Sequence, residues 1–252
     1  MKEIQDNRRE FIKNSVSTAA GLLMLPIMPA LAKASSESVP EVEPQAMPLA
    51  GRIKFSVIGM NHGHIYGQVE AVVRGGGELV SFYAKEPELV SAFAKRYPKA
   101  KQASSEQEIL NDKSIQLVLS AGIPDERAPL GIRVMKSGKD YMADKPGITS
   151  LEQLAQVRKV QKETKRIYSI MYSERLENKA TIKAGELIKE GAIGKVIQTI
   201  GLGPHRITPK SRPEWFFDKK RFGGIICDIA SHQFDQFLFF TGSTKADIVA
   251  SQ

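Results

Sequence analysis

The sequence predicts an α/β fold built on a parallel β-sheet. Three observations support this class: short apolar segments recur after residue 52, amphipathic stretches with helical periodicity separate them, and a glycine-containing turn follows the first apolar segment. Strands that alternate with helices of about 10–15 residues are typical of βαβ units. In such sheets ligands bind beyond the carboxyl ends of the strands, so residues at those ends are the first candidates for function.

The expected elements follow one another in a regular order. The first apolar segment ends at Gly59, and the helix after it is stopped by the glycines at 75–77. Pro87 suits the first turn of a helix, and Ser150 or Thr149 suits the N-cap of a later one. Strands are expected at residues 53–58, 78–83, 115–120, 141–143 and 166–171, and helices at 64–74, from 87 onward, at 128–137 and at 151–164.

The turn after the first strand lies where a dinucleotide-binding fingerprint belongs. That fingerprint would place glycines at 59, 61 and 64. Only Gly59 fits, because Asn61 and His64 occupy the other two positions. Asparagine tolerates a positive φ better than most residues, and the N–H groups at the start of the next helix still suit a pyrophosphate. Gly59, Met60, Asn61 and His62 are therefore candidates for cofactor binding.

His62 and His64 allow three interpretations. They contact a phosphate or the substrate, they are ordinary loop histidines, or they share a metal ion. A protein metal site takes three or four ligands, and the sequence has no third ligand close to this pair. We therefore expect no metal.

The end of the second strand bears on the choice between NAD and NADP. An acidic residue there binds the ribose 2′-hydroxyl of NAD. This chain has Ala84 at that place, followed by Lys85. We expect no carboxylate for the hydroxyl and expect Lys85 to suit a 2′-phosphate. The pattern therefore admits NADP as well as NAD, and a weakened or lost cofactor site stays an alternative.

The tripeptide Asp144-Lys145-Pro146 follows directly after the expected strand at residues 141–143. A lysine at the carboxyl edge of a parallel sheet faces the nucleotide crevice. Downstream, Asp228 and His232 are four residues apart on an expected helix, so both side chains point to one face. A lysine, a histidine and a carboxylate beside a nucleotide indicate proton handling during hydride transfer. The alternative is a surface lysine and a packed helix histidine.

The first 34 residues have the pattern of a signal peptide. Arg8-Arg9 precedes an apolar run broken by two prolines, and Ala32 and Ala34 suit a signal peptidase that cleaves before Ser35. The arginine pair resembles a twin-arginine export signal; a general secretion signal and an amphipathic anchor are the alternatives. Residues 35–51, rich in proline and glutamate, are expected to form a flexible linker. The pattern predicts an exported, periplasmic protein that uses the twin-arginine machinery and has no stable membrane insertion after cleavage.

The composition excludes several classes of protein. The formal net charge is +8, of which residues 1–34 contribute five basic and three acidic residues, so the remainder is near +6. These charges are spread along expected helices, and no motif of interleaved basic and aromatic residues indicates nucleic-acid binding. A single cysteine, Cys227, excludes an internal disulfide and a multi-cysteine metal site.

The chain resembles the glucose–fructose oxidoreductase, inositol dehydrogenase and MocA family from about residue 53 to its last residue. Four stretches carry the resemblance: residues 58–59 with the helix after them, 137–146, 190–196 and 223–235. In the second stretch, 137–146, Asp144 replaces the family's usual glutamate before the lysine.

The resemblance implies a doubly wound Rossmann domain at residues 52–172. It also implies an α/β domain with an open, mostly antiparallel sheet at 173–252, which forms an oligomer face in the family. Strands are expected at 196–201 and 247–251, and the second domain is expected to be incomplete. A homo-oligomer is expected if that domain is complete.

The resemblance also implies roles for single residues. Lys145 contacts the reacting hydroxyl and the nicotinamide region, and His232 takes the hydroxyl proton. Asp228 orients the imidazole or binds a neighbouring hydroxyl, while Tyr172 is a weaker candidate for substrate contact. The expected cofactor-binding residues are Gly59, Met60, Asn61, His62, Lys85, Asp144 and Lys145.

The resulting hypothesis is an exported NAD(P)-dependent oxidoreductase that acts on a sugar, a polyol or a related hydroxy compound. Two alternatives stay open. One is a glycosidase of the same family, in which oxidation, elimination and return of the hydride cleave a glycosidic bond. The other is a catalytically inactive protein that binds a nucleotide or a sugar.

Overall fold

The computed structural model describes residues 53–251. The signal-peptide and linker predictions concern residues 1–51, which lie outside the described residues. Among the helices of residues 53–251, none has both the length and the apolar character needed to cross a bilayer.

Residues 54–171 contain one six-stranded parallel sheet. Its order, β3-β2-β1-β4-β5-β6, is that of a doubly wound Rossmann domain, in which the direction of winding reverses between β1 and β4. The crevice at that reversal is where such sheets bind nucleotides. The strands are β1 (Lys54–Ile58), β2 (Glu78–Tyr83), β3 (Lys101–Gln102), β4 (Leu117–Ser120), β5 (Asp140–Asp144) and β6 (Tyr168–Met171).

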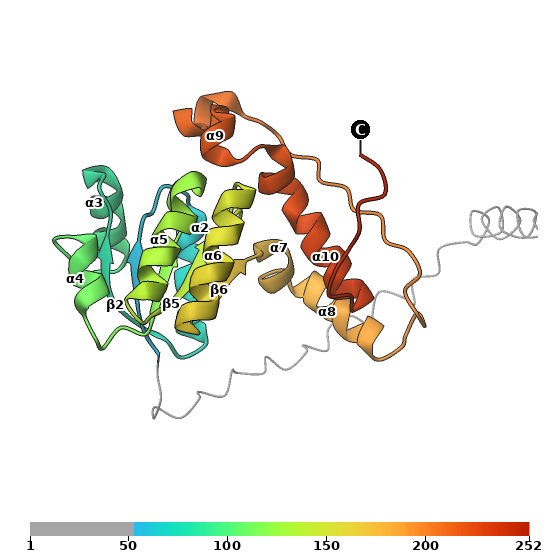
Figure 1. The fold of residues 1–252 in the computed structure, drawn as a ribbon, viewed down its shortest axis with the longest axis horizontal. Coiled ribbons are helices and arrows are strands. Elements are labelled where there is room, and N and C mark those ends of the chain that lie inside the picture. Colours follow the sequence, from blue (N-terminus) through green and yellow to red (C-terminus); the bar gives the residue numbers. More distant parts are fainter. Residues whose placement is uncertain (1–52, 252) are drawn as a thin grey trace, which may run out of the picture. The chain divides into compact units, whose positions relative to one another are not determined.

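Helices cover both faces of this sheet. On one face, α2 (His64–Arg74) and α3 (Pro87–Arg96) pack against side chains of β1 and β2. On the other, α4 (Glu106–Asn111) and α5 (Pro124–Lys136) pack against β4 and β5, and α6 (Leu151–Thr164) lies beside α5 (Figure 1). The alternation of side chains in β1 explains both cores, because Phe55 and Val57 face α2 while Ile58 faces the α4 side.

Most expected elements of this domain are confirmed; the structure adds two elements and extends a third. The expected ranges of α2, β2 and α6 match the structure, whereas β3 and α4 were not expected. Helix α5 begins at Pro124 rather than at residue 128, since proline is well suited to a first turn. This earlier start places Arg127 inside the helix, where it reaches the end of β5.

The residues after β6 are mostly helical, and the prediction of an antiparallel sheet there is wrong for the described residues. Residues 196–201 and 247–251 form no strand. A strand needs a hydrogen-bonding neighbour, and neither segment pairs with the other or with the sheet in residues 53–251. Ile197 and Val249 are accordingly 92% and 99% exposed.

Helices α7, α8 and α10 of this part lie beyond the β6 edge of the sheet, whereas α9 contacts α5 (Figure 1). Helix α10 packs against α7 and α8, and the π-helical segment η4 leads directly into it. The elements are α7 (Ser173–Leu176), α8 (Lys179–Lys189), η2 (Pro209–Ser211), η3 (Glu214–Phe217), α9 (Lys219–Phe222), η4 (Ile226–Ala230) and α10 (Ser231–Thr241).

Candidate active site

Arg127 holds the end of β5 in place. Its guanidinium, 1% exposed, donates from Nη1 to the carbonyl oxygens of Asp144, Lys145 and Pro146 at 3.0, 2.7 and 3.1 Å. Its Nε donates to the carbonyl of Gly122 at 2.7 Å. Nη2 also lies 3.2 Å from Oδ2 of the Asp144 carboxylate. The backbone that carries Lys145 is therefore fixed by several charge-assisted hydrogen bonds inside the protein.

A cavity of about 250 Å³ lies beyond this edge of the sheet. Lys145 and Arg127 line it from the sheet side, and Asp228 lines it from the helical side. All four histidines of the sequence line it as well: His62, His64, His205 and His232. The fold thus brings together residues that are up to 170 positions apart, which is 232 minus 62. Such a concave pocket with convergent polar groups is the default location of an active site.

Lys145 and Asp228 form a buried ion pair across the cavity. The Lys145 Nζ donates to Asp228 Oδ1 at 2.8 Å and lies 3.2 Å from the Asp228 carbonyl oxygen. The two residues are 7% and 8% exposed. Asp228 lies in the π-helical segment η4, whereas the sequence predicted one regular helix through residue 232. Single π-helical turns within helices occur frequently at functional sites.

His232 is buried at the base of the cavity, 3% exposed. Its Nε2 lies 3.9 Å from Glu174 Oε1, and its buried Nδ1 has no hydrogen-bond partner among residues 53–251. Burial lowers the pKa of His232 below 6.5, although the Glu174 carboxylate opposes the shift. Tyr172 packs edge-on against this imidazole at 6.0 Å between ring centroids, and it is not among the described residues that line the cavity.

Asp144 lies under the two turn histidines. Its carboxylate, 2% exposed, is 3.3 Å from His62 Nδ1 and 3.0 Å from His64 Nδ1. Burial by itself would raise the pKa of Asp144, but Arg127 and the two histidines outweigh burial and hold this pKa far below 3.8. Asp144 is thus a charged anchor inside the protein. The expectation that the histidine pair lacks a third ligand group was wrong, since Asp144 approaches it from 80 positions away in the sequence.

A second cleft lies at the β1–β4 reversal. Gly59 has a φ of +79°, and a Cβ there would lie 3.1 Å from Gly122 Cα and 3.2 Å from Ser120 Oγ. Glycine is therefore required at 59, as in dinucleotide-binding turns. Among residues 53–251, no group accepts from the N–H groups of Met60 and Asn61, which suits a pyrophosphate.

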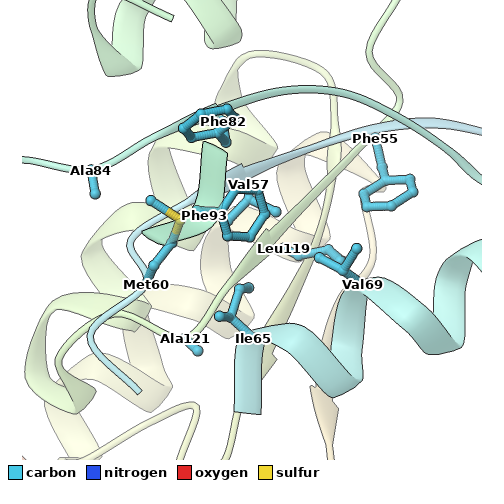
Figure 2. Close-up of a cluster of buried hydrophobic side chains, with 10 residues drawn as sticks. All are labelled: Phe55, Val57, Met60, Ile65, Val69, Phe82, Ala84, Phe93, Leu119 and Ala121. Carbon is cyan, nitrogen blue, oxygen red and sulfur yellow. The ribbon is translucent and has the colours of Figure 1, made fainter. Parts of the chain in front are cut away.

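The sequence-predicted cofactor residues divide between two environments. Gly59, Asn61 and Lys85 line the cleft. The side chain of Met60 points into the core with Phe82 and Phe93 (Figure 2), so only its backbone is left for a contact with a cofactor. His62, the neighbour of Asn61, lines the large cavity instead.

Glu86 brings a carboxylate to the cleft, although none was expected there from the sequence. It lines the cleft together with Ala84 and Lys85, and it accepts a hydrogen bond from Asn61 Nδ2 at 2.8 Å. The expected position for the acid was residue 84, at the end of β2. An acid two positions later is visible in the sequence, but only the turn between β2 and α3 shows that it points back into the cleft.

Two family models match the chain. The model described as "Oxidoreductase family, NAD-binding Rossmann fold" matches residues 53–172, and the model of the "GFO/IDH/MocA C-terminal domain" matches residues 181–251. The two models name the same family and together cover most of the described residues. The chain therefore belongs to the GFO/IDH/MocA family of oxidoreductases, and residues 53–172 are its NAD-binding Rossmann domain.

Similar proteins include one of known structure. A crystal structure from Erwinia carotovora atroseptica, described only as that of an oxidoreductase, is 41% identical with a TM-score of 0.77, over 80% of this chain and 60% of that one. The uncharacterized oxidoreductase YdgJ of Escherichia coli K12 is 26% identical over 58% of this chain and 42% of its own. The scyllo-inositol 2-dehydrogenase (NADP(+)) IolW of Bacillus subtilis 168 is 27% identical over 60% of this chain and 41% of its own. The chain thus spans less than half the length of the last two.

Proposed function

We propose that this protein is an NAD(P)-dependent dehydrogenase that oxidises a CH–OH group of a sugar or polyol, or reduces the corresponding carbonyl. The observation that carries the proposal is the grouping of Lys145, Asp228 and His232 on one cavity beside the nucleotide cleft. The B. subtilis relative, whose name assigns it an inositol as substrate, supports the substrate class.

The residues present fit a nicotinamide cofactor. Gly59 and Gly122 allow close backbone approach at the β1–β4 crevice, and the N–H groups of Met60 and Asn61, in the turn after β1, have no acceptor among residues 53–251. When bound, the nicotinamide takes up or returns the hydride. Asn61 lines this cleft and the adjacent His62 lines the cavity, so the substrate pocket begins where the cleft ends.

Lys145 is the residue we propose to stabilise the developing charge. Its ammonium group points across the cavity to Asp228 at 2.8 Å and lies away from bulk solvent. A substrate hydroxyl in the cavity becomes more acidic beside this cation, because the alkoxide is stabilised as hydride leaves carbon. Asp228 keeps the ammonium oriented and accepts a hydrogen bond from a neighbouring substrate hydroxyl.

His232 is the proposed base. Because burial lowers its pKa, the imidazole is neutral at pH 7 and can take the hydroxyl proton. The acceptor is Nε2, on the side of Glu174. The Glu174 side chain is 37% exposed, so it offers the proton a path from the buried imidazole to solvent.

Glu86 favours NAD over NADP in this proposal. A half-buried carboxylate fixed by Asn61 in the ribose end of the cleft accepts a hydrogen bond from a 2′-hydroxyl and repels a 2′-phosphate. Lys85, exposed at the rim of the same cleft, is the group that would oppose this preference. The name of the B. subtilis relative specifies NADP(+), so the two proteins would differ in cofactor preference.

The test is a rate measurement on the purified protein with NAD or NADP and a panel of sugars and polyols. Formation of reduced nicotinamide is followed by its absorbance. Lys145→Ala should lower kcat by about 10²–10³-fold, the typical effect of losing one group that stabilises transition-state charge. Lys162→Ala, on the exposed face of α6, is the matched control and should retain wild-type rates. Equal activity of Lys145→Ala and wild type would disprove the proposed role.

We further propose export through the twin-arginine route. The support is the Arg8-Arg9 pair followed by an apolar run and a small-residue cleavage motif. Replacing both arginines by lysine should retain the protein in the cytoplasm in a cell-fractionation experiment. Unchanged periplasmic recovery of that variant would point to the general secretion pathway instead.

A further inference from the structure

Three ligand groups meet at the start of α2 and the end of β5. One nitrogen each from His62 and His64 and one oxygen from Asp144 all lie within 4.8 Å of one another. Around a metal ion with bonds of about 2.0–2.2 Å, neighbouring ligand atoms stand roughly 3.0–3.4 Å apart. The two separations from the histidine Nδ1 atoms to the Asp144 oxygens, 3.3 and 3.0 Å, lie in that range.

The hydrogen bonding within this group leaves one buried oxygen unsatisfied. The backbone N–H of His64 points at His62 Nδ1 at 3.4 Å, so this nitrogen acts as an acceptor there. In the tautomer in which Nδ1 accepts from this N–H, it faces Asp144 Oδ2 at 3.3 Å, so that two acceptors lie opposite each other. Asp144 is 2% exposed, and its Oδ2 has an ion pair with Arg127 Nη2 at 3.2 Å but no hydrogen bond among residues 53–251. A metal ion bound by His62 Nδ1 and Asp144 Oδ2 would give both acceptors a partner.

We propose that His62, His64 and Asp144 bind a divalent first-row transition metal, of the Zn²⁺ or Fe²⁺ type. Two imidazoles and one carboxylate are a ligand set of catalytic zinc and of non-haem iron, and both leave coordination positions open. Hard ions such as Mg²⁺ prefer a set of oxygen ligands. The site goes beyond the proposed dehydrogenase activity and does not depend on it.

The surroundings favour an open site of this kind. Arg127 Nη2, 3.2 Å from Asp144 Oδ2, forms an ion pair with the carboxylate and helps to orient it, the role that outer partners of metal ligands have. Both histidines line the cavity that Lys145 and His232 also line. A metal ion held by these two histidines would therefore lie beside the cavity in which we propose that the substrate binds.

The test measures metal binding without substrate or cofactor, so its result is independent of the dehydrogenase assignment. The full-length protein is stripped with a chelator and titrated with Zn²⁺ in competition with a fluorescent indicator. Co²⁺ then serves as a visible-absorption probe, and Fe²⁺ is titrated without oxygen to separate the two metals. We expect one equivalent of Zn²⁺ or Fe²⁺ to bind and Mg²⁺ not to compete.

The decisive variant is His64→Gln, with His205→Gln as the matched control, since both histidines line the same cavity and only His64 belongs to the cluster. His64→Gln should weaken Zn²⁺ binding by more than the about 10–100-fold that loss of an outer partner costs. His205→Gln should bind as wild type does. No stoichiometric binding, wild-type affinity in His64→Gln, or an equal loss in His205→Gln would each overturn the proposal.

Thermal unfolding keeps the test valid if a variant folds poorly. A ligand that binds only the native state raises the melting temperature. Zn²⁺ should raise it for wild type and His205→Gln, but not for His64→Gln or a second variant, His62→Gln. A Zn²⁺-induced rise of the same size in all four proteins would show adventitious binding and contradict the proposed site.

Discussion

An arginine–aspartate pair supports each of the two walls of the cavity. In the sheet wall, which carries Lys145, the pair is Arg127 and Asp144, 1% and 2% exposed. In the helical wall, which carries Asp228 and His232, the pair is Arg175 and Asp235, with side chains 25% and 13% exposed. The second pair has the better fork geometry, with Nε and Nη2 at 2.5 and 2.9 Å from the two carboxylate oxygens.

The difference shows what each wall depends on. Arg127 also satisfies four backbone carbonyls, so it connects α5, the β4 loop and the end of β5 in one arrangement. Arg175 links α7 to α10 near solvent, where screening limits the energy of an ion pair. We infer that the position of Lys145 is determined mainly by buried polar contacts, and that of His232 mainly by helix packing.

The largest effect, a loss of folding free energy, is expected when the sheet wall loses the side chain of Arg127. Arg127→Met leaves the Asp144 charge buried without its main partner, and such losses cost about 3–5 kcal/mol of folding free energy. Arg175→Met should cost about 1 kcal/mol or less, as pairs near the surface do. Urea denaturation of both variants measures the difference. Equal losses would show that the two walls do not differ in this way.

The next largest effect is expected in the helical wall, which carries the proposed general base, His232. His232→Gln should lower kcat/KM for oxidation by about 10²-fold or more, the usual contribution of a general base. In the wild type, the pKa of His232 lies below 6.5, so activity should fall only as the pH drops below that value. The variant should lack this acidic limb. A wild-type limb above pH 6.5, or one retained in the variant, would assign the proton transfer to another group.

A smaller effect is expected in the nucleotide cleft. Glu86→Gln should weaken NAD binding by about 10-fold, because hydrogen bonds to charged groups contribute about 1.5–3 kcal/mol. NADP binding should change little or improve, since the variant loses a charge beside the 2′-phosphate. Lys85→Ala is the complementary variant and should weaken NADP alone. Dissociation constants from quenching of protein fluorescence test both, and an NADP loss in Glu86→Gln would exclude the proposed ribose contact.

The smallest effect is the dependence of folding stability on pH. Burial is the main cause that lowers the pKa values of His62 and His232 in the folded state. The unfolded chain then binds more protons in acid, so the stability is complete above the ordinary histidine pKa of 6.5 and falls as the pH drops below it. Urea midpoints at neutral and mildly acidic pH measure the fall. His232→Gln should reduce it, and a midpoint that rises toward acid would contradict these assignments.

The Rossmann domain could be predicted from the sequence because its signals are local. Apolar segments separated by helical periodicity, Gly59 at the first turn and Ser150 as an N-cap all act on neighbouring residues. The ranges of α2, β2 and α6 followed from these signals. The antiparallel sheet failed for the opposite reason, since residues 196–201 and 247–251 become strands only if other segments pair with them.

Some residues of the candidate site could be recognised from local sequence signals, and others could not. Lys145, Asp228 and His232 were recognised from motifs, and the structure brings them to one cavity. Arg127 was not recognised, because nothing around it in the sequence distinguishes a buried arginine from an exposed one on a helix. Its role depends on β5, whose carbonyl oxygens accept its hydrogen bonds.

The sequence by itself determined the parallel α/β class, the glycine turn and the residues that carry the proposed chemistry, since periodicity, turn conformation and residue type are properties of short segments. Only the tertiary structure decided which of these residues meet. Asp144 joins His62 and His64 from 80 positions away, and Glu86 turns back into the cleft two residues later than expected. Both contacts cross between elements, and their distances are set by the packing of the sheet and its helices.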